Sequence, residues 1–143
     1  MYWVEVCNGG DTKKIVSNKL NWIKSLTTKQ TGDITENIAA KYLRKQHLKL
    51  LECNFSSKFG EIDLICEDQD VIVFVEVKYR KSAQYGGAIS TISASKQKKL
   101  KLCASFYLQQ SQLNEYNTPC RFDVVALQGA LSEPQITWLK NAF

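Results

Sequence analysis

The sequence predicts an α/β fold in which a helix, three strands, a second helix and one or two further strands follow one another, the order α-β-β-β-α-β. Two patterns predict this order. Apolar residues recur every three or four positions in two segments, and short runs rich in β-branched and aromatic residues lie between and after those segments. The chain has 143 residues, 44% hydrophobic and 23% charged, which is typical of one globular domain and not of a disordered, collagen-like or membrane-spanning protein.

Residues 1–31 differ from the rest of the chain and are interpreted as an appended basic segment. They contain five lysines and two acidic residues, a net charge of +3 within a total of +5. Asn8-Gly9-Gly10-Asp11 signals a turn, and the apolar residues from Ile15 to Leu26 form a weak helical stripe. The segment is expected either to form a short docking helix or to lie as a tail across a basic surface. The domain itself is expected to span residues 32–143.

A first helix is predicted from Asp33 to about Gln46, because apolar residues recur there at spacings of three and four. Thr31 or Asp33 is placed to cap its start. Two roles are open for Glu36. Asp33 and Glu36 have the spacing of a capping box, in which the glutamate folds back onto the backbone N–H of the cap. Position 36 also shares a helix face with Leu43, which turns its carboxylate towards the core.

Three strands are predicted next, over residues 48–55, 61–66 and 71–79, with turns at 56–60 and 67–70. The second turn is acidic and makes the second and third strands an antiparallel hairpin. The third strand carries β-branched and aromatic residues on both faces, which is typical of a central strand that is covered on each side.

A second helix is predicted over residues 93–110, where apolar residues recur along one face and lysines fill the polar face. Two more strands are predicted at 120–127 and 135–139, and each of them follows a proline. These segments complete the predicted order of elements.

Simple features exclude several classes of protein. The longest uncharged apolar run, 71–75, is far shorter than the roughly 20 residues that cross a bilayer, and the start of the chain lacks the pattern of a signal peptide. We therefore expect a cytoplasmic protein with no membrane partner. The five cysteines include no C-x-x-C pair and His47 is the only histidine, so the sequence predicts neither a disulfide framework nor a standard zinc site.

The strongest indication of a catalytic site is the spacing of Asp63, Glu76 and Lys78. Side chains alternate between the faces of a strand, so Glu76 and Lys78 lie on the face that Ile72 and Phe74 share. Burying such charges costs on the order of several kcal/mol unless they are paired, bound to a metal or at the wet edge of the sheet. The predicted hairpin brings Asp63 near Glu76 at its open end.

Two carboxylates and a lysine at this spacing suit phosphodiester hydrolysis. Carboxylate oxygens hold Mg²⁺, the ion polarises a phosphate oxygen and acidifies a bound water, and an ammonium stabilises charge on the phosphoryl group or orients the water. The alternative is that Glu76 and Lys78 form only a cross-strand ion pair at the sheet edge. Glu61 lies on the same strand as Asp63 and is interpreted as a solvated partner of Lys58.

The wider sequence resembles a known family. Asp63 followed by Glu76-x-Lys78 resembles the PD-(D/E)xK signature of restriction-endonuclease-like nucleases, with Ile62 in place of the proline of that signature. From about Thr31 to Leu127 the chain is similar to the YraN-type family of small endonuclease-like proteins. The motifs that carry this resemblance are Gly32-Asp33-x-x-Glu36-x-x-Ala39-x-x-Tyr42-Leu43, Asn54-Phe55, Gly60-Glu61-Ile62-Asp63-Leu64-Ile65, Phe74-Val75-Glu76-Val77-Lys78-x-Arg80, Lys96-Gln97 and Arg121-Phe122-Asp123-Val124-Val125.

The resemblance implies a restriction-endonuclease-like core, with a central mixed β-sheet of four to five strands flanked by helices, and a relationship to Holliday-junction resolvases. It also implies that Asp63 and Glu76 are ligands of Mg²⁺ or Mn²⁺ and that Lys78 is the catalytic lysine. Glu36 would then be a further acidic ligand. For Glu36, the roles of metal ligand and helix cap therefore both stay open.

Basic residues around these positions are expected to contact nucleic acid. The lysines of the second helix are interpreted either as a basic patch that contacts the phosphates of DNA or as an ordinary solvated helix face. Lys96 lies on the apolar stripe and is expected to turn inwards beside Gln97, and both resemble positions near the scissile phosphate in nucleases of this fold. The full set of expected contacts is Arg80, Lys81, Lys96, Gln97, Lys98, Lys99 and Lys101.

The sequence thus predicts a metal-dependent nuclease that acts on DNA, with structured or branched DNA as the expected substrate. A non-catalytic nucleic-acid-binding module of the same fold is the alternative. A structural subunit that binds an acidic partner through the basic helix would explain the lysines but not Glu76 and Lys78. A homodimer is compatible with the sequence.

Overall fold

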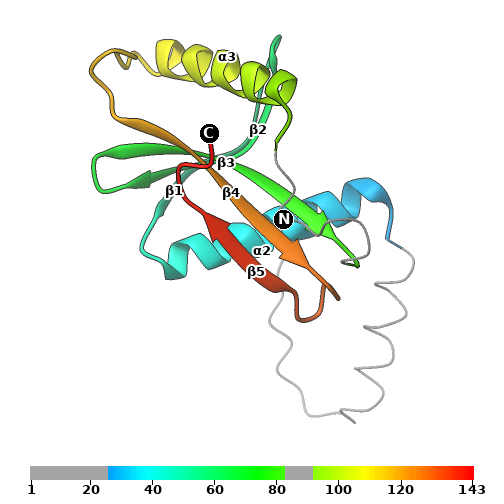
Figure 1. The fold of residues 1–143 in the computed structure, drawn as a ribbon. Helices are drawn as coiled ribbons and strands as arrows, with labels where there is room; N and C mark the ends of the chain where they lie inside the picture. Colours follow the sequence, from blue (N-terminus) through cyan, green and yellow to red (C-terminus); the bar gives the residue numbers. More distant parts are fainter. Residues whose placement is uncertain (1–25, 83–91) are drawn as a thin grey trace, which may run out of the picture.

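Five strands form one sheet, and a helix packs on each of its faces (Figure 1). The computed structural model describes residues 26–82 and 92–143, so the appended segment predicted for 1–31 falls almost entirely outside the described residues. Each predicted strand and the second helix is confirmed, with its ends within two residues of the prediction. The elements are α2 (Thr28–Lys45), β1 (Lys49–Ser57), β2 (Gly60–Asp68), β3 (Val71–Arg80), α3 (Ala94–Gln110), β4 (Cys120–Gln128) and β5 (Gln135–Leu139).

The sheet is mixed, as the resemblance implied. Its strands lie in the order β1-β2-β3-β4-β5, and the neighbours are antiparallel except β3 and β4, which are parallel and are connected through α3. The predicted hairpin of β2 and β3 is present, with Leu64 opposite Val75 and Asp68 opposite Val71. β3 is the middle strand, which is why its sequence is apolar on both faces.

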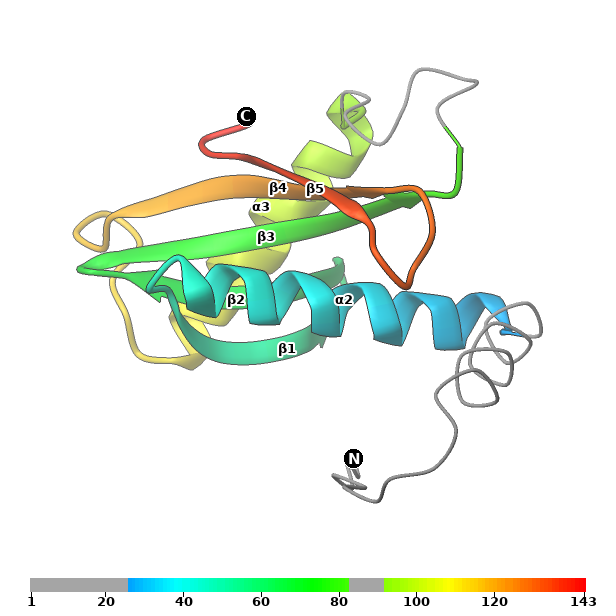
Figure 2. The ribbon, with the colours of Figure 1, turned by 90° about the horizontal axis from the view of Figure 1, so that it is seen from below.

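The two faces of β3 belong to two separate apolar cores. Val73 and Val75 pack in the core that contains α2, whereas Ile72 and Phe74 pack in the core that contains α3. Figure 2 shows α2 running along one face of the sheet with α3 on the other. Since side chains alternate along the strand, Glu76 continues the face that α3 covers.

The first helix begins earlier than predicted. Thr27 is its N-cap: Thr27 Oγ1 accepts a hydrogen bond from the backbone N–H of Gln30 at 3.2 Å, and Gln30 Oε1 accepts one from the backbone N–H of Thr27 at 2.9 Å. This capping box satisfies N–H groups that the first turn leaves unpaired. The prediction that Thr31 or Asp33 caps the helix was therefore wrong, and the expected boundary after Thr31 falls inside α2.

Candidate active site

Asp63 lies where the β2–β3 ladder ends. The paired residues run from Asp68 and Val71 to Leu64 and Val75, and one further step along the two strands leads to Asp63 and Glu76. At this point the side chain of Asp63, and not its backbone, bonds to the neighbouring strand: its Oδ2 accepts a hydrogen bond from the backbone N–H of Val77 at 2.7 Å. The two predicted site carboxylates are thus close neighbours on adjacent strands.

Burial and the neighbouring acid both act on Asp63. Loss of solvent and then the charge of Glu76 raise the pKa of the Asp63 carboxyl to about 7, while the N–H of Val77 works in the opposite direction. Glu36 contributes a smaller increase and Lys96 a smaller decrease. A carboxyl with this pKa is largely protonated below neutral pH, and a nearby cation would favour its ionised form. Strongly shifted carboxyl pKa values of this kind are concentrated at functional sites.

Glu76 has a buried oxygen that accepts no hydrogen bond. Its side chain is 13% exposed, and Lys96 Nζ lies 3.2 Å from its Oε2, close enough for an ion pair but without hydrogen-bond geometry. Within residues 26–82 and 92–143, Glu76 Oε2 is the only buried side-chain nitrogen or oxygen that lacks a hydrogen-bond partner. Such a group costs about 1–3 kcal/mol or more when it is left unsatisfied. Its charge is thus balanced by the Lys96 ammonium, while its hydrogen-bonding capacity is left unused.

Lys78 is half-buried on β3 and lies on the same strand face as Glu76. Burial lowers the pKa of its ammonium group, the charge of Glu76 raises it, and the charges of Arg80 and Lys96 lower it further. Lys78 and Lys96 are thus close enough to interact with each other and with Glu76. Two ammonium groups and two carboxylates share this end of the sheet.

Glu36 approaches from α2. Because Thr27 and Gln30 cap the helix, the capping role considered for Glu36 is wrong. Burial raises the pKa of the Glu36 carboxyl, and a hydrogen bond from the Asn54 side chain opposes the increase. Asn54 lies on β1 with a backbone φ of 53°, a left-handed conformation that asparagine tolerates better than most residues. Glu36 is the outermost of the three carboxylates.

Asn54 is a site residue to which the sequence analysis gave no role. It belonged to the Asn54-Phe55 motif, but a strand of alternating pattern gives no sign of a left-handed residue within it. The available signal was the residue type, since asparagine is uncommon inside strands and enriched at positive φ.

The donor set fits a hard divalent cation. Mg²⁺ is usually held by one or two carboxylates and completes its shell with water and substrate phosphates, and Asp63 and Glu76 supply such a pair with one acceptor still unsatisfied. In the described part of the chain, no three histidine, cysteine, aspartate or glutamate side chains are grouped tightly enough to form a ready-made metal cage. The positive charge beside Glu76 Oε2 is instead that of Lys96, at 3.2 Å.

The remaining basic residues divide into inward and outward groups. Lys96 turns inwards, the orientation that its place on the helical stripe predicted. Gln97 Nε2 instead donates a hydrogen bond to the carbonyl of Ile92 at 3.0 Å, so its side chain holds the start of α3. The exposed group consists of Arg80, Lys81, Lys98, Lys99 and Lys101.

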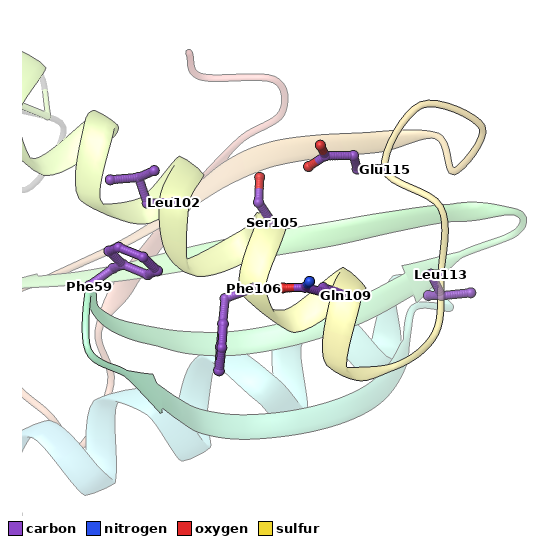
Figure 3. Close-up of a pocket in the computed structure, with 7 residues that line it drawn as sticks. All are labelled: Phe59, Leu102, Ser105, Phe106, Gln109, Leu113 and Glu115. Atoms are coloured by element: carbon purple, nitrogen blue, oxygen red, sulfur yellow. The ribbon is translucent and has the colours of Figure 1, made fainter.

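A hollow of about 400 Å³ lies on the exposed side of α3, away from the carboxylates. Figure 3 shows the side chains that surround it, of which Glu115 is the one charged residue. Asp63, Glu76 and Lys78 are not part of its lining. The lining residues are Phe59, Leu102, Ser105, Phe106, Gln109, Leu113 and Glu115.

Residues 35–127 match the profile of the uncharacterised protein family UPF0102. This match agrees with the resemblance to YraN-type proteins noted from the sequence. The chain belongs to this family. The matched range contains all the acidic and basic residues of the site described above. In the described residues, no helix is long and apolar enough to cross a membrane.

Relatives in the family match over most of their length. A UPF0102 protein of Colwellia psychrerythraea is 61% identical over 120 residues, covering 84% of this chain and 93% of the relative. One of Pseudomonas putida is 49% identical over 115 residues, covering 80% and 93%. One of Photobacterium profundum is 44% identical over 116 residues, covering 81% and 91%.

Proposed function

We propose that this protein is a metal-dependent nuclease that hydrolyses phosphodiester bonds in DNA. The observation that carries the proposal is the pair of neighbouring carboxylates, Asp63 and Glu76, in which Glu76 Oε2 is buried without a hydrogen-bond donor. Two neighbouring carboxylates with one lysine ion pair leave negative charge that a divalent cation would balance. Lys78 on the same face would supply an ammonium to stabilise charge on the phosphoryl group.

Asp63 and Glu76 would hold Mg²⁺ or Mn²⁺, and Glu36 would add a carboxylate from the side of α2. When bound, the cation supplies positive charge for a phosphate oxygen and makes a bound water more acidic. The crowding of two acids contributes to the raised pKa of Asp63, and this carboxyl would have to release its proton to hold the cation.

Lys78 would act on the reacting phosphate. Its ammonium lies beside Glu76 on the face covered by α3, where it can donate a hydrogen bond to a phosphoryl oxygen or orient the attacking water. Its partial burial excludes part of the solvent and so strengthens the electrostatic contact.

DNA would be bound mainly through its phosphates. The exposed lysines of α3, together with Arg80 and Lys81 at the end of β3, are suited to such contacts, which position a duplex without reading its sequence. Structured or branched DNA is the proposed substrate, supported by the resemblance to Holliday-junction resolvases. A cytoplasmic location is part of this proposal, because the substrate is DNA.

A second function, a non-catalytic nucleic-acid-binding module, is favoured by one observation. Lys96 rather than another carboxylate lies against Glu76, and the described residues contain no three-residue metal cage. In that case Glu76 would serve only to hold Lys96.

The two functions are separated by cleavage of single-stranded, duplex and four-way-junction DNA with Mg²⁺, Mn²⁺ or EDTA. The nuclease is supported by cleavage that needs the cation and is lost in both Glu76→Ala and Lys78→Ala. Cleavage that survives both substitutions indicates a contaminant and contradicts the proposal. Binding without cleavage that is weakened by replacing Lys98, Lys99 and Lys101, but not by Glu76→Ala, supports the binding module.

A further inference from the structure

Lys96 and Glu76 form an ion pair with an unusual geometry. Lys96 Nζ lies 3.2 Å from Glu76 Oε2, yet this oxygen accepts no hydrogen bond. The carboxylate is largely enclosed, with 13% of its side chain exposed, whereas the Lys96 side chain is 42% exposed. The ammonium group therefore neutralises the carboxylate while keeping a route to solvent.

The contact is not needed to hold α3 in place. Ser93 caps the helix, with its Oγ accepting a hydrogen bond from the backbone N–H of Lys96 at 3.3 Å. Gln97 binds the carbonyl of Ile92, and Leu100 and Cys103 are buried against the sheet. The backbone of Lys96 is fixed by these contacts, so its long side chain can move without displacing the helix.

From this geometry we infer that Lys96 is a built-in counter-ion that occupies the metal-binding oxygen of Glu76 until a divalent cation displaces it, whereupon the ammonium group turns to a DNA phosphate. The inference rests on the proposed function, because it assumes a cation at Asp63 and Glu76. It makes Lys96 a positioning residue through which cation binding strengthens DNA binding.

The consequence is a pair of effects with opposite signs. Removing the Lys96 charge removes the competitor, so the cation binds more tightly, by about tenfold for a partly exposed ion pair of this kind. The same substitution removes a phosphate contact, so DNA binds more weakly in the presence of the cation. A lysine that served only as a structural partner would give neither the tighter cation binding nor its dependence on Glu76.

The test is calorimetric titration of the full chain with Mn²⁺, without DNA, for wild type, Lys96→Met, Lys98→Met and Glu76→Gln. Lys98 is the matched control, because it lies two residues further along α3, carries the same charge and is exposed. Lys96→Met is expected to bind Mn²⁺ about tenfold more tightly than wild type. Lys98→Met is expected to stay within about twofold of wild type, because an exposed charge beyond the site is screened by solvent. Lys96→Gln serves in place of Lys96→Met should that variant not fold.

Different outcomes bear on different claims. Should Lys96→Met bind Mn²⁺ no more tightly than Lys98→Met while Glu76→Gln abolishes binding, the counter-ion role is wrong and the metal site stands. Should neither wild type nor any lysine variant bind Mn²⁺, both this inference and the proposed metal site are wrong. Binding by Lys96→Met alone would support a counter-ion that competes more strongly than expected.

Discussion

Asp123 on β4 and Glu76 on β3 are carboxylates one step apart in the same sheet, since Asp123 pairs with Val75, the chain neighbour of Glu76. Asp123 is fully buried and accepts hydrogen bonds from Arg121 Nε, from Trp138 Nε1 at 3.0 Å and from the backbone N–H of Asn141 at 2.9 Å. Glu76 Oε2, by contrast, accepts none.

The difference teaches how to distinguish a structural acid from a functional one. Arg121 also donates to Asp68 at 2.8 Å, so the Asp123 network ties β4 to β2 and β5 through one arginine that both carboxylates share. Paired in this way, a buried charge is compatible with a stable fold. Burial alone therefore says little, and the unsatisfied acceptor of Glu76 is the informative feature.

The largest expected effect is on catalysis. Glu76→Gln should lower Mg²⁺-dependent cleavage of four-way-junction DNA about 10³-fold, because it removes a charged ligand from the site. The free energy of unfolding measured in EDTA should change by less than about 1 kcal/mol, because the lost ion pair is with Lys96, whose side chain is 42% exposed. Glu61→Gln, an exposed change of the same type on β2, is the control and should leave both quantities unaltered. A large loss of stability in Glu76→Gln would remove the contrast with Asp123.

The next largest effect is on stability at the other carboxylate. Asp123→Asn should lower the free energy of unfolding by about 3 kcal/mol, because an amide nitrogen replaces a fully buried oxygen that accepts hydrogen bonds, one of them from the charged Arg121. Urea denaturation measures the change, with the exposed turn residue Asp70→Asn as the control. A loss below about 1 kcal/mol, the usual value for a surface ion pair, would contradict a structural role for Asp123.

Asp63 gives the fold a dependence on pH. Its pKa is raised from 3.8 to about 7, so the native state binds this proton more tightly than the unfolded chain does. The resulting stability is complete below about pH 4 and is lost as the pH rises through 7. Between pH 5 and 8 in EDTA, wild type should lose about 2 kcal/mol more than Asp63→Asn. Equal pH profiles from urea denaturation would show that Asp63 is not perturbed.

The smallest effect concerns a single donor to Asp123. Trp138→Phe should cost about 1 kcal/mol, because Asp123 Oδ2 keeps its hydrogen bond from Arg121 Nε. The free energy of unfolding from urea denaturation measures this change. A loss as large as that of Asp123→Asn would mean that the network depends on the indole and not on the arginine.

Most of the fold was predictable because short local sequences determine where its helices and strands begin and end. The turns at Lys58-Phe59 and Gln69-Asp70 and the prolines before β4 and β5 end or begin elements through their own conformational preferences. The start of α2 was not predicted, because Thr27-x-x-Gln30 and Asp33-x-x-Glu36 both match the capping-box pattern and only the second directly precedes the apolar stripe.

The candidate site was only partly predictable. The alternation of β3 was enough to place Glu76 and Lys78 on one face, and the hairpin was enough to bring Asp63 near them. The contact of Lys96 with Glu76 depends on how α3 lies across β3, which no local pattern specifies. The hydrogen bond from Val77 to Asp63 likewise depends on where the ladder ends.

The central claim is that Asp63 and Glu76 together hold a divalent cation, and a crystal structure of the full chain with Mn²⁺ tests it most directly. The account predicts an anomalous-scattering peak within bonding distance of an Asp63 carboxylate oxygen and of Glu76 Oε2, with Lys96 Nζ moved away from that oxygen. Crystals that contain Mn²⁺ elsewhere, with Lys96 still 3.2 Å from Glu76 and no peak between the two acids, would contradict it.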